Sequence, residues 1–260
     1  MFDVVGFIES VKKHDVGRLS GMDISAQNFD FRQLNEQVKN SNDEVLIINN
    51  CCGQRFIGTG VKDKKIIING TPGNALGAYL DGAVIEVNGN VQDGVGDTMN
   101  DGKIIVHGNA GDALGYAMRG GSIFVEGNAG YRTGIHMKEY EKKRPAIVIG
   151  GSVGSFLGEY LAGGIIIVLG LERTAELMGN FTGTGMHGGY IYIRTSSKLQ
   201  GLPSQVMAEV ADKEDLQMIE PYLLEFENYF GVCSKDLMND SFYVLKPNAK
   251  NPYKRLYTAN

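Results

Sequence analysis

The chain has 260 residues, of which 43% are hydrophobic, and a formal net charge of −5 at pH 7. This composition allows a full hydrophobic core, and the acidic balance lacks the basic footprint that is typical of nucleic-acid-binding proteins. The sequence contains no run of 18 apolar residues, so no transmembrane helix is predicted. The start of the chain lacks the basic-then-apolar order of a signal peptide. We therefore expect a cytoplasmic protein with neither a membrane nor a nucleic acid as its partner.

The N-terminal segment, residues 1–43, contains one short predicted helix. The stretch FDFRQLNEQVKN, Phe29 to Asn40, is amphipathic, and Asp30 stands at the position of an N-cap.

Residues 44–195 are dominated by a glycine-punctuated repeat. Four stretches begin at Lys65, Val84, Lys103 and Ser122, and each runs through a short β-branched segment to a glycine 19 residues after the previous one. A fifth copy follows a five-residue insertion, and a sixth comes 19 residues later. The anchor glycines that close these segments are Gly70, Gly89, Gly108, Gly127, Gly151 and Gly170.

A second glycine follows each anchor after seven residues in the first five copies. These second glycines are Gly77, Gly96, Gly115, Gly134 and Gly158. The sixth copy has Leu177 at this offset and departs from the pattern, while VLIINNCCGQRFIGTG reads as an earlier, degenerate copy. Glycine at a fixed offset is typical of corners that need positive φ or close backbone approach.

Apolar residues recur at four other offsets, which we call the inner columns. They stand four and two residues before the anchor and six and ten residues after it. They are Ile66, Ile85, Ile104, Ile123, Ile147 and Ile166; Ile68, Val87, Val106, Val125, Ile149 and Val168; Leu76, Val95, Leu114, Thr133 and Leu157; and Leu80, Met99, Met118, Met137 and Leu161. Stacked coils put like residues above one another, so the sequence predicts a mainly all-β fold. We expect a right-handed parallel β-helix, a solenoid of about seven coils with short flanking helices.

The C-terminal segment, residues 196–260, is predicted to hold helices and a tail packed on the solenoid. Ala208 to Phe230 reads as two short helices. Asp212 is placed to cap the first, Pro221 to start the second and Gly231 to end it. We expect the flanking helices to cover the ends of the solenoid, where open strand edges promote aggregation.

Few side chains suggest chemistry. Cys51, Cys52 and Cys233 form no disulfide or zinc pattern, and no metal site is predicted. The stretch GTGMHG, Gly183 to Gly188, fits a dinucleotide motif only superficially, because a strand follows it where a helix is required. His107 falls in a column that we expect to face solvent.

The insertion is the best candidate for a contact with another protein. His136, Lys138, Glu139 and Tyr140 lie where the repeat breaks, and they show no nucleophile–base pattern. We therefore predict a docking role for these four residues, with a solvated loop as the alternative, and we predict no catalytic or cofactor-binding residue.

Taken as a set, the motifs resemble the C-terminal glycine-repeat (GXGXG) domain of the glutamate synthase large subunit. The resemblance runs from TPGNALGAYLDG through GYRTGIHMKEY, GEYLAGG and GTGMHGGYIYIR to EDLQMIEPYLLEFENYFG, and covers about Asp23 to Leu245. It implies a right-handed β-helix and, for a chain of this length, a stand-alone subunit of the archaeal type.

The resemblance also implies the partners. These are a class II glutamine amidotransferase subunit and an FMN-binding glutamate synthase subunit, which would carry the nucleophile, the FMN and an iron–sulfur cluster. This chain would then be no enzyme by itself and hold no cofactor, although it could form an oligomer.

Three other functions stay open. The repeat is also similar to glycine-repeat subunits of methylglutamate synthase and formylmethanofuran dehydrogenase. A free-standing ligand-binding solenoid is another possibility. A polysaccharide lyase or hydrolase is less favoured, because no acidic pair recurs on one face of the repeat.

Overall fold

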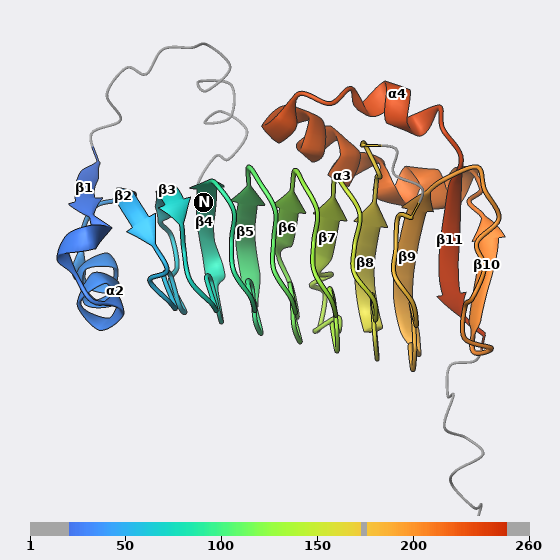
Figure 1. The fold of residues 1–260 in the computed structure, drawn as a ribbon, viewed down its shortest axis with the longest axis horizontal. Helices are drawn as coiled ribbons and strands as arrows, with labels where there is room; N and C mark the ends of the chain where they lie inside the picture. The colour runs from blue at the N-terminus through green and yellow to red at the C-terminus, as the bar shows by residue number, and fades with distance from the viewer. Residues whose placement is uncertain (1–20, 173–175, 249–260) are drawn as a thin grey trace, which may run out of the picture.

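The computed structural model describes residues 21–172 and 176–248. Its centre is one 11-stranded, mostly parallel sheet in the order β1-β2-β3-β4-β5-β6-β7-β8-β9-β11-β10 (Figure 1). The strands are β1 (Met22–Ser25), β2 (Val45–Cys52), β3 (Lys65–Thr71), β4 (Asp81–Asn88), β5 (Asp101–Val106), β6 (Ser122–Val125), β7 (Ala146–Ile149), β8 (Ala162–Val168), β9 (Gly188–Arg194), β10 (Val206–Val210) and β11 (Phe242–Pro247). The mainly all-β prediction is confirmed.

Each predicted copy of the repeat contributes one strand, and the copies pair side by side in chain order. Ile66 pairs with Ile85, and Ile104 with Ile123, so residues at the same offset are neighbours. A second set of parallel bridges links the connecting segments and runs through Val91, Ala110, Ala129, Val153 and Met178. Every repeat therefore contacts the next at two places along its length.

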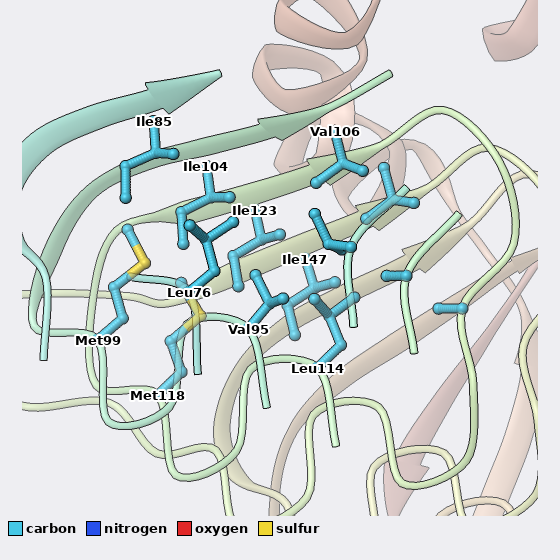
Figure 2. Packing of buried hydrophobic residues seen from close by; sticks show 14 of the residues in the cluster. Leu76, Ile85, Val95, Met99, Ile104, Val106, Leu114, Met118, Ile123 and Ile147 are labelled. Carbon is cyan, nitrogen blue, oxygen red and sulfur yellow. The ribbon is translucent and has the colours of Figure 1, made fainter. Parts of the chain in front are cut away.

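The inner columns form the core between the strands and the connecting segments. All the side chains predicted for these columns are buried, including the hydroxyl of Thr133, which donates to the Gly130 carbonyl at 3.2 Å. Figure 2 shows Ile85, Ile104, Ile123 and Ile147 in one row, with Leu76, Val95 and Leu114 packed against them. The β-branched strand residues and the Leu and Met of the connecting segments thus share one continuous core.

The sixth copy keeps its second glycine, contrary to the prediction from Leu177. Met178 pairs with Val153, so extra residues lie between Gly170 and Met178, and the second-glycine position falls to Gly183. Gly183 N donates to the Leu157 carbonyl at 2.7 Å, as the second glycine of each earlier copy does to its own predecessor. The fixed offset missed this because it allowed for no insertion after the anchor.

The earlier, degenerate copy is confirmed as a member of the stack. Its strand β2 pairs in register with β3 as far as Ile48, and a β-bulge then brings Cys51 opposite the anchor Gly70. Gly58 follows seven residues after Cys51 with a φ of +74°, so it is the second glycine of this copy.

A helix lies at the β1 end of the stack (Figure 1). A 3-10 turn, η1 (Ala26–Asn28), precedes α2 (Phe31–Asn40), and Asp30 caps α2 as predicted. The Asp30 carboxylate accepts from the backbone N–H groups of Arg32 and Gln33, and the Gln33 side chain accepts in return from Asp30 N. This reciprocal capping box satisfies donors that are otherwise left free at a helix start.

The prediction of two helices between Ala208 and Phe230 is wrong. The first residues form β10, and one helix, α3 (Lys213–Phe230), then runs straight through Pro221. Asp212 caps this helix and Gly231 ends it in a left-handed conformation, as expected. A second helix, α4 (Ser234–Met238), follows. One continuous buried face, formed by Ile219, Leu223 and Phe226, outweighs the hydrogen bond that a proline removes.

Helix α3 also lies elsewhere than expected. It covers the outer face of the strands around β6 to β9, and β11 with β10 close that end of the sheet (Figure 1). The outward side chains Phe124, Val148 and Ile167 are fully buried in a second core with α3 and α4. An apolar outer face needs a cover, which explains why the helix packs there. Within the described residues, no helix is long and apolar enough to cross a membrane.

Candidate partner-docking surface

The insertion that interrupts the repeat forms a short hairpin held against neighbouring repeats. Tyr140 and Lys143 make an isolated antiparallel bridge, with two backbone hydrogen bonds of 3.2 and 3.0 Å. The Lys143 ammonium lies 2.9 Å from an Asp101 carboxylate oxygen and donates to the Asn100 carbonyl at 3.3 Å. The insertion therefore has a defined shape and position on the stack.

The four residues predicted at the docking site separate into two groups. Glu139 belongs to the hairpin's own contacts, because its Oε1 accepts from Arg144 Nε at 3.0 Å and from Gly164 N at 3.3 Å. His136, Lys138 and Tyr140 are exposed. These three remain available to a partner, and their docking role stays a prediction.

His136 lies in a row of aromatic side chains at the corner of the stack. Its ring stacks on Tyr160 with a centroid distance of 5.1 Å and an interplanar angle of 11°, and it meets the ring of Tyr116 edge-on at 6.0 Å. The sequence already put His136 and Tyr160 at the same offset from their anchors. The structure brings the two rings into contact because the repeats stack in register.

A second row at the same corner was not predicted from the sequence. The Arg132 guanidinium lies 4.9 Å from the Phe156 ring centroid, and Phe156 stacks on Phe181 at 5.0 Å. Arg132 Nε also lies 3.4 Å from a Glu159 carboxylate oxygen. The signal was present, since Arg132 and Phe156 each stand five residues after an anchor glycine. The shared offset does not by itself reveal the contact, which depends on the register in which the repeats stack.

The GTGMHG stretch is a corner of the stack and does not start a helix. Gly183 and Gly185 have φ values of +72° and +71°, and β9 begins at Gly188. The Nδ1 atom of His187 lies 3.1 Å from the Gly185 carbonyl oxygen. A dinucleotide fingerprint needs a helix N-terminus for the phosphates, and the described residues offer none here.

His107 is half-buried in an ion-pair cluster, whereas the sequence predicted a solvent-facing residue. Its Nε2 lies 3.2 Å from a Glu86 carboxylate oxygen, and its ring meets Phe230 of α3 edge-on at 5.2 Å. Lys65 Nζ lies 3.0 Å from the other Glu86 oxygen. The hydrogen bond from His107, with the charge of Lys65, lowers the pKa of Glu86 to about 2. The end of α3 explains this burial, which sequence alone did not reveal.

This cluster predicts a specific loss of stability in acid. The pKa of Glu86 is lower in the folded chain than its ordinary value of 4.5, so its contribution is present above pH 4.5 and is lost as the pH falls towards about 2. Between about pH 5 and pH 2, the urea midpoint of the wild type should therefore fall further than that of Glu86→Gln. Glu220 of α3, which is exposed and makes no ion pair with a described residue, is the matched control when mutated to Gln. Parallel pH profiles for wild type and Glu86→Gln would contradict the assignment.

The comparison with protein families matches the repeat as a whole. A family model described as the GXGXG motif matches residues 25–248. The chain belongs to the GXGXG motif family. In this family member the glycines of the motif shape the backbone at the corners of the stack. Both glycines have positive φ in each of the pairs Gly58–Gly60, Gly94–Gly96 and Gly183–Gly185.

Two relatives extend the comparison. An uncharacterized protein of Methanocaldococcus jannaschii is 43% identical over 249 residues, which cover 90% of this GXGXG chain and 95% of the relative. A chain of the formyltransferase/hydrolase complex (FhcABCD) from Methylorubrum extorquens, solved with methylofuran, has a similar fold at a TM-score of 0.61 and 18% identity. That similarity covers 88% of this chain and 91% of the other.

The thiols of this GXGXG chain are free. Cys51 is buried, and burial raises the pKa of its thiol to about 11, which disfavours the reactive thiolate. Cys52 and Cys233 are exposed; Cys52 ends β2, and Cys233 immediately precedes α4. Among the described residues, no group of three or more His, Cys, Asp or Glu is arranged to hold a metal ion.

Proposed function

We propose that this chain is a non-catalytic structural subunit of a glutamate synthase-type complex, acting in glutamate biosynthesis and ammonia assimilation. The observation that carries the proposal is the match to the GXGXG motif over residues 25–248, nearly all of the described chain. The resemblance of the repeat and of both flanks to the glutamate synthase glycine-repeat domain supports it. In this proposal the stacked repeats form a right-handed parallel β-helix.

The proposed role follows from how the repeat uses its residues. The inner columns are devoted to packing, and the corners to backbone geometry. Such a stack has few internal degrees of freedom, since each repeat is bonded to its neighbours at two places. It would hold the amidotransferase and FMN-binding subunits at a fixed separation, so that ammonia released by one reaches the other. The nucleophile, the FMN and the iron–sulfur cluster would belong to those partners.

Reconstitution tests this role. The chain is co-expressed with the class II amidotransferase subunit and the FMN-binding subunit of the same genome, and the mixture is separated by size-exclusion chromatography. We expect the three chains to co-elute and to form glutamate from glutamine and 2-oxoglutarate. Omitting this chain should leave glutamine hydrolysis uncoupled from glutamate formation. Full coupling without it would refute the scaffold role.

The purified chain alone should hydrolyse no glutamine and form no glutamate, because the proposal places every reacting group on its partners. The assay uses glutamine, 2-oxoglutarate and a reduced electron donor, and follows activity across successive purification steps. Turnover that rises in proportion to the purity of this chain would make it an enzyme and overturn the proposal.

A second candidate is a glycine-repeat subunit of a related complex, such as methylglutamate synthase or formylmethanofuran dehydrogenase. It is favoured by the fold similarity to a chain of the FhcABCD formyltransferase/hydrolase complex. Affinity purification from the source organism separates the two candidates. A class II amidotransferase together with an FMN-binding glutamate synthase subunit among the co-purified chains supports the first candidate, and formyl-transferring partners support a formylmethanofuran dehydrogenase-type complex.

A further inference from the structure

One corner of the stack carries an exposed surface that the packing of the chain does not require. We call it the corner surface and define it by Tyr116, Arg119, His136, Lys138, Tyr160 and Phe181. The side chain of Phe181 is 57% exposed, that of Tyr116 is 40% exposed and that of Tyr160 is 36% exposed. Large aromatic side chains that gather on one exposed surface mark interaction sites more often than single exposed rings do.

The rings of the corner surface are fixed before any partner arrives. His136 is stacked between repeats on Tyr160, and Phe181 is stacked on Phe156. Their backbone is fixed as well, since His136 N donates to the Glu159 carbonyl at 2.9 Å and Tyr160 N to the Thr184 carbonyl at 2.8 Å. A pre-ordered surface loses little conformational entropy on binding, and Tyr and Arg are enriched among residues that dominate binding energy.

Two cations on the corner surface have no counter-charge in the described parts of the chain. Arg119 and Lys138 are exposed and occupy the same offset in consecutive repeats, whose strand backbones are spaced about 4.8 Å apart. Neither makes an ion pair with a described residue, whereas Arg132 nearby is paired with Glu159. The surface is therefore locally positive on a chain whose net charge is −5.

We propose that the corner surface docks an acidic segment of a partner subunit, which places carboxylates against Arg119 and Lys138 and covers the aromatic rows. The reason is electrostatic. Covering the rings would remove water from the two cations beside them, and a desolvated cation without a counter-ion is strongly unfavourable. A partner that buries this surface must therefore supply negative charge. Such complementarity also speeds association and makes it sensitive to salt.

A second copy of this chain is the competing occupant. Asp93 and Asp112 are exposed on earlier repeats at the same corner. The acidic repeats of one copy could therefore pair with Arg119 and Lys138 of another copy. Both carboxylates are already engaged, because Asp93 Oδ1 accepts from Asp112 N at 2.9 Å and Asp112 Oδ1 from Tyr131 N at 2.8 Å. They are less free to meet the cations of another copy, which favours a different subunit.

The test is the double variant Arg119→Glu/Lys138→Glu, compared with Lys213→Glu/Lys235→Glu. The control makes the same change in net charge at two exposed lysines, Lys213 of α3 and Lys235 of α4, which lie outside the corner surface. Binding to the purified amidotransferase and FMN-binding subunits is measured by titration calorimetry at low and high salt. We expect the first variant to bind one of these subunits at least about tenfold more weakly, with its salt dependence reduced, and the control to bind like the wild type.

The outcomes separate this inference from the proposed function on which it rests. If the wild type binds neither subunit, the proposed function fails, and this inference with it. If wild type and Arg119→Glu/Lys138→Glu bind a subunit equally tightly, the function stands and the corner surface is not the docking site. If light scattering finds a wild-type dimer that the charge reversal dissociates, the surface joins two copies, and the proposed acidic partner is wrong. A melting temperature equal to that of the wild type excludes misfolding as the cause.

Discussion

Replacing Gly115 with valine should lower the free energy of unfolding by about 4 kcal/mol, from backbone strain plus overpacking of the core. Gly115 is a second glycine with a φ of +67°, a conformation that a β-branched residue strongly disfavours. An added Cβ would also lie 2.4 Å from Ile147 Cδ1, in the middle of the inner columns. Both costs act together because the corner turns directly over the buried strand.

Gly201→Val is the matched control for this prediction. Gly201 has nearly the same φ, +71°, but no atom lies within 4 Å of an added Cβ. It therefore shares the backbone strain and lacks the collision with the core, and we expect it to cost about 1–3 kcal/mol. Urea denaturation of the two variants gives the difference. Equal losses of stability would mean that the core accommodates the added methyl groups, and the corner assignment for Gly115 would have to be abandoned.

The repeat could be predicted from sequence because its signal is duplicated. A single Ile104 says little, but isoleucine four residues before six successive anchors predicts a shared environment, and all six are buried. The capping of α2 and α3 was also predictable, because Asp30 and Asp212 act through bonds only two or three residues away. Local chemistry and strict periodicity are both readable without knowing the long-range packing.

The features that the sequence failed to predict depend instead on contacts between distant segments. The single helix through Pro221 and the burial of His107 both depend on where α3 packs, which is a contact between segments over 100 residues apart. The outward position of Phe124 is consistent with a helix packed over it, but a single outward phenylalanine in a strand is equally compatible with exposure to solvent. Likewise, Arg119 and Lys138 occupy the same offset, but whether each has a counter-ion is decided only by the fold.

Replacing Phe226 with alanine should have a comparably large effect, centred on α3. Phe226 is fully buried, packs on Phe230 with a centroid distance of 4.6 Å, and its ring lies over the backbone of Gly150. A Cβ at position 150 would collide with the Glu126 carbonyl oxygen and lie 3.0 Å from Cζ of the ring, so the glycine there makes room for both. Removing a buried phenylalanine costs about 3–5 kcal/mol, and α3 cannot collapse onto a rigid sheet to fill the cavity.

Leu224→Ala on the same helix separates packing from helix propensity. Leu224 is 48% exposed, and leucine and alanine differ little as helix formers, so we expect a loss below about 0.5 kcal/mol. Hydrogen exchange then locates the damage in Phe226→Ala. Amides of α3 and α4 should lose protection, while those of β3 to β5, whose core lies inside the repeats, should keep theirs. If protection instead falls equally in every strand, α3 is part of the folding unit of the whole stack. If Phe226→Ala is as stable as Leu224→Ala, the second core does not hold the helix in place.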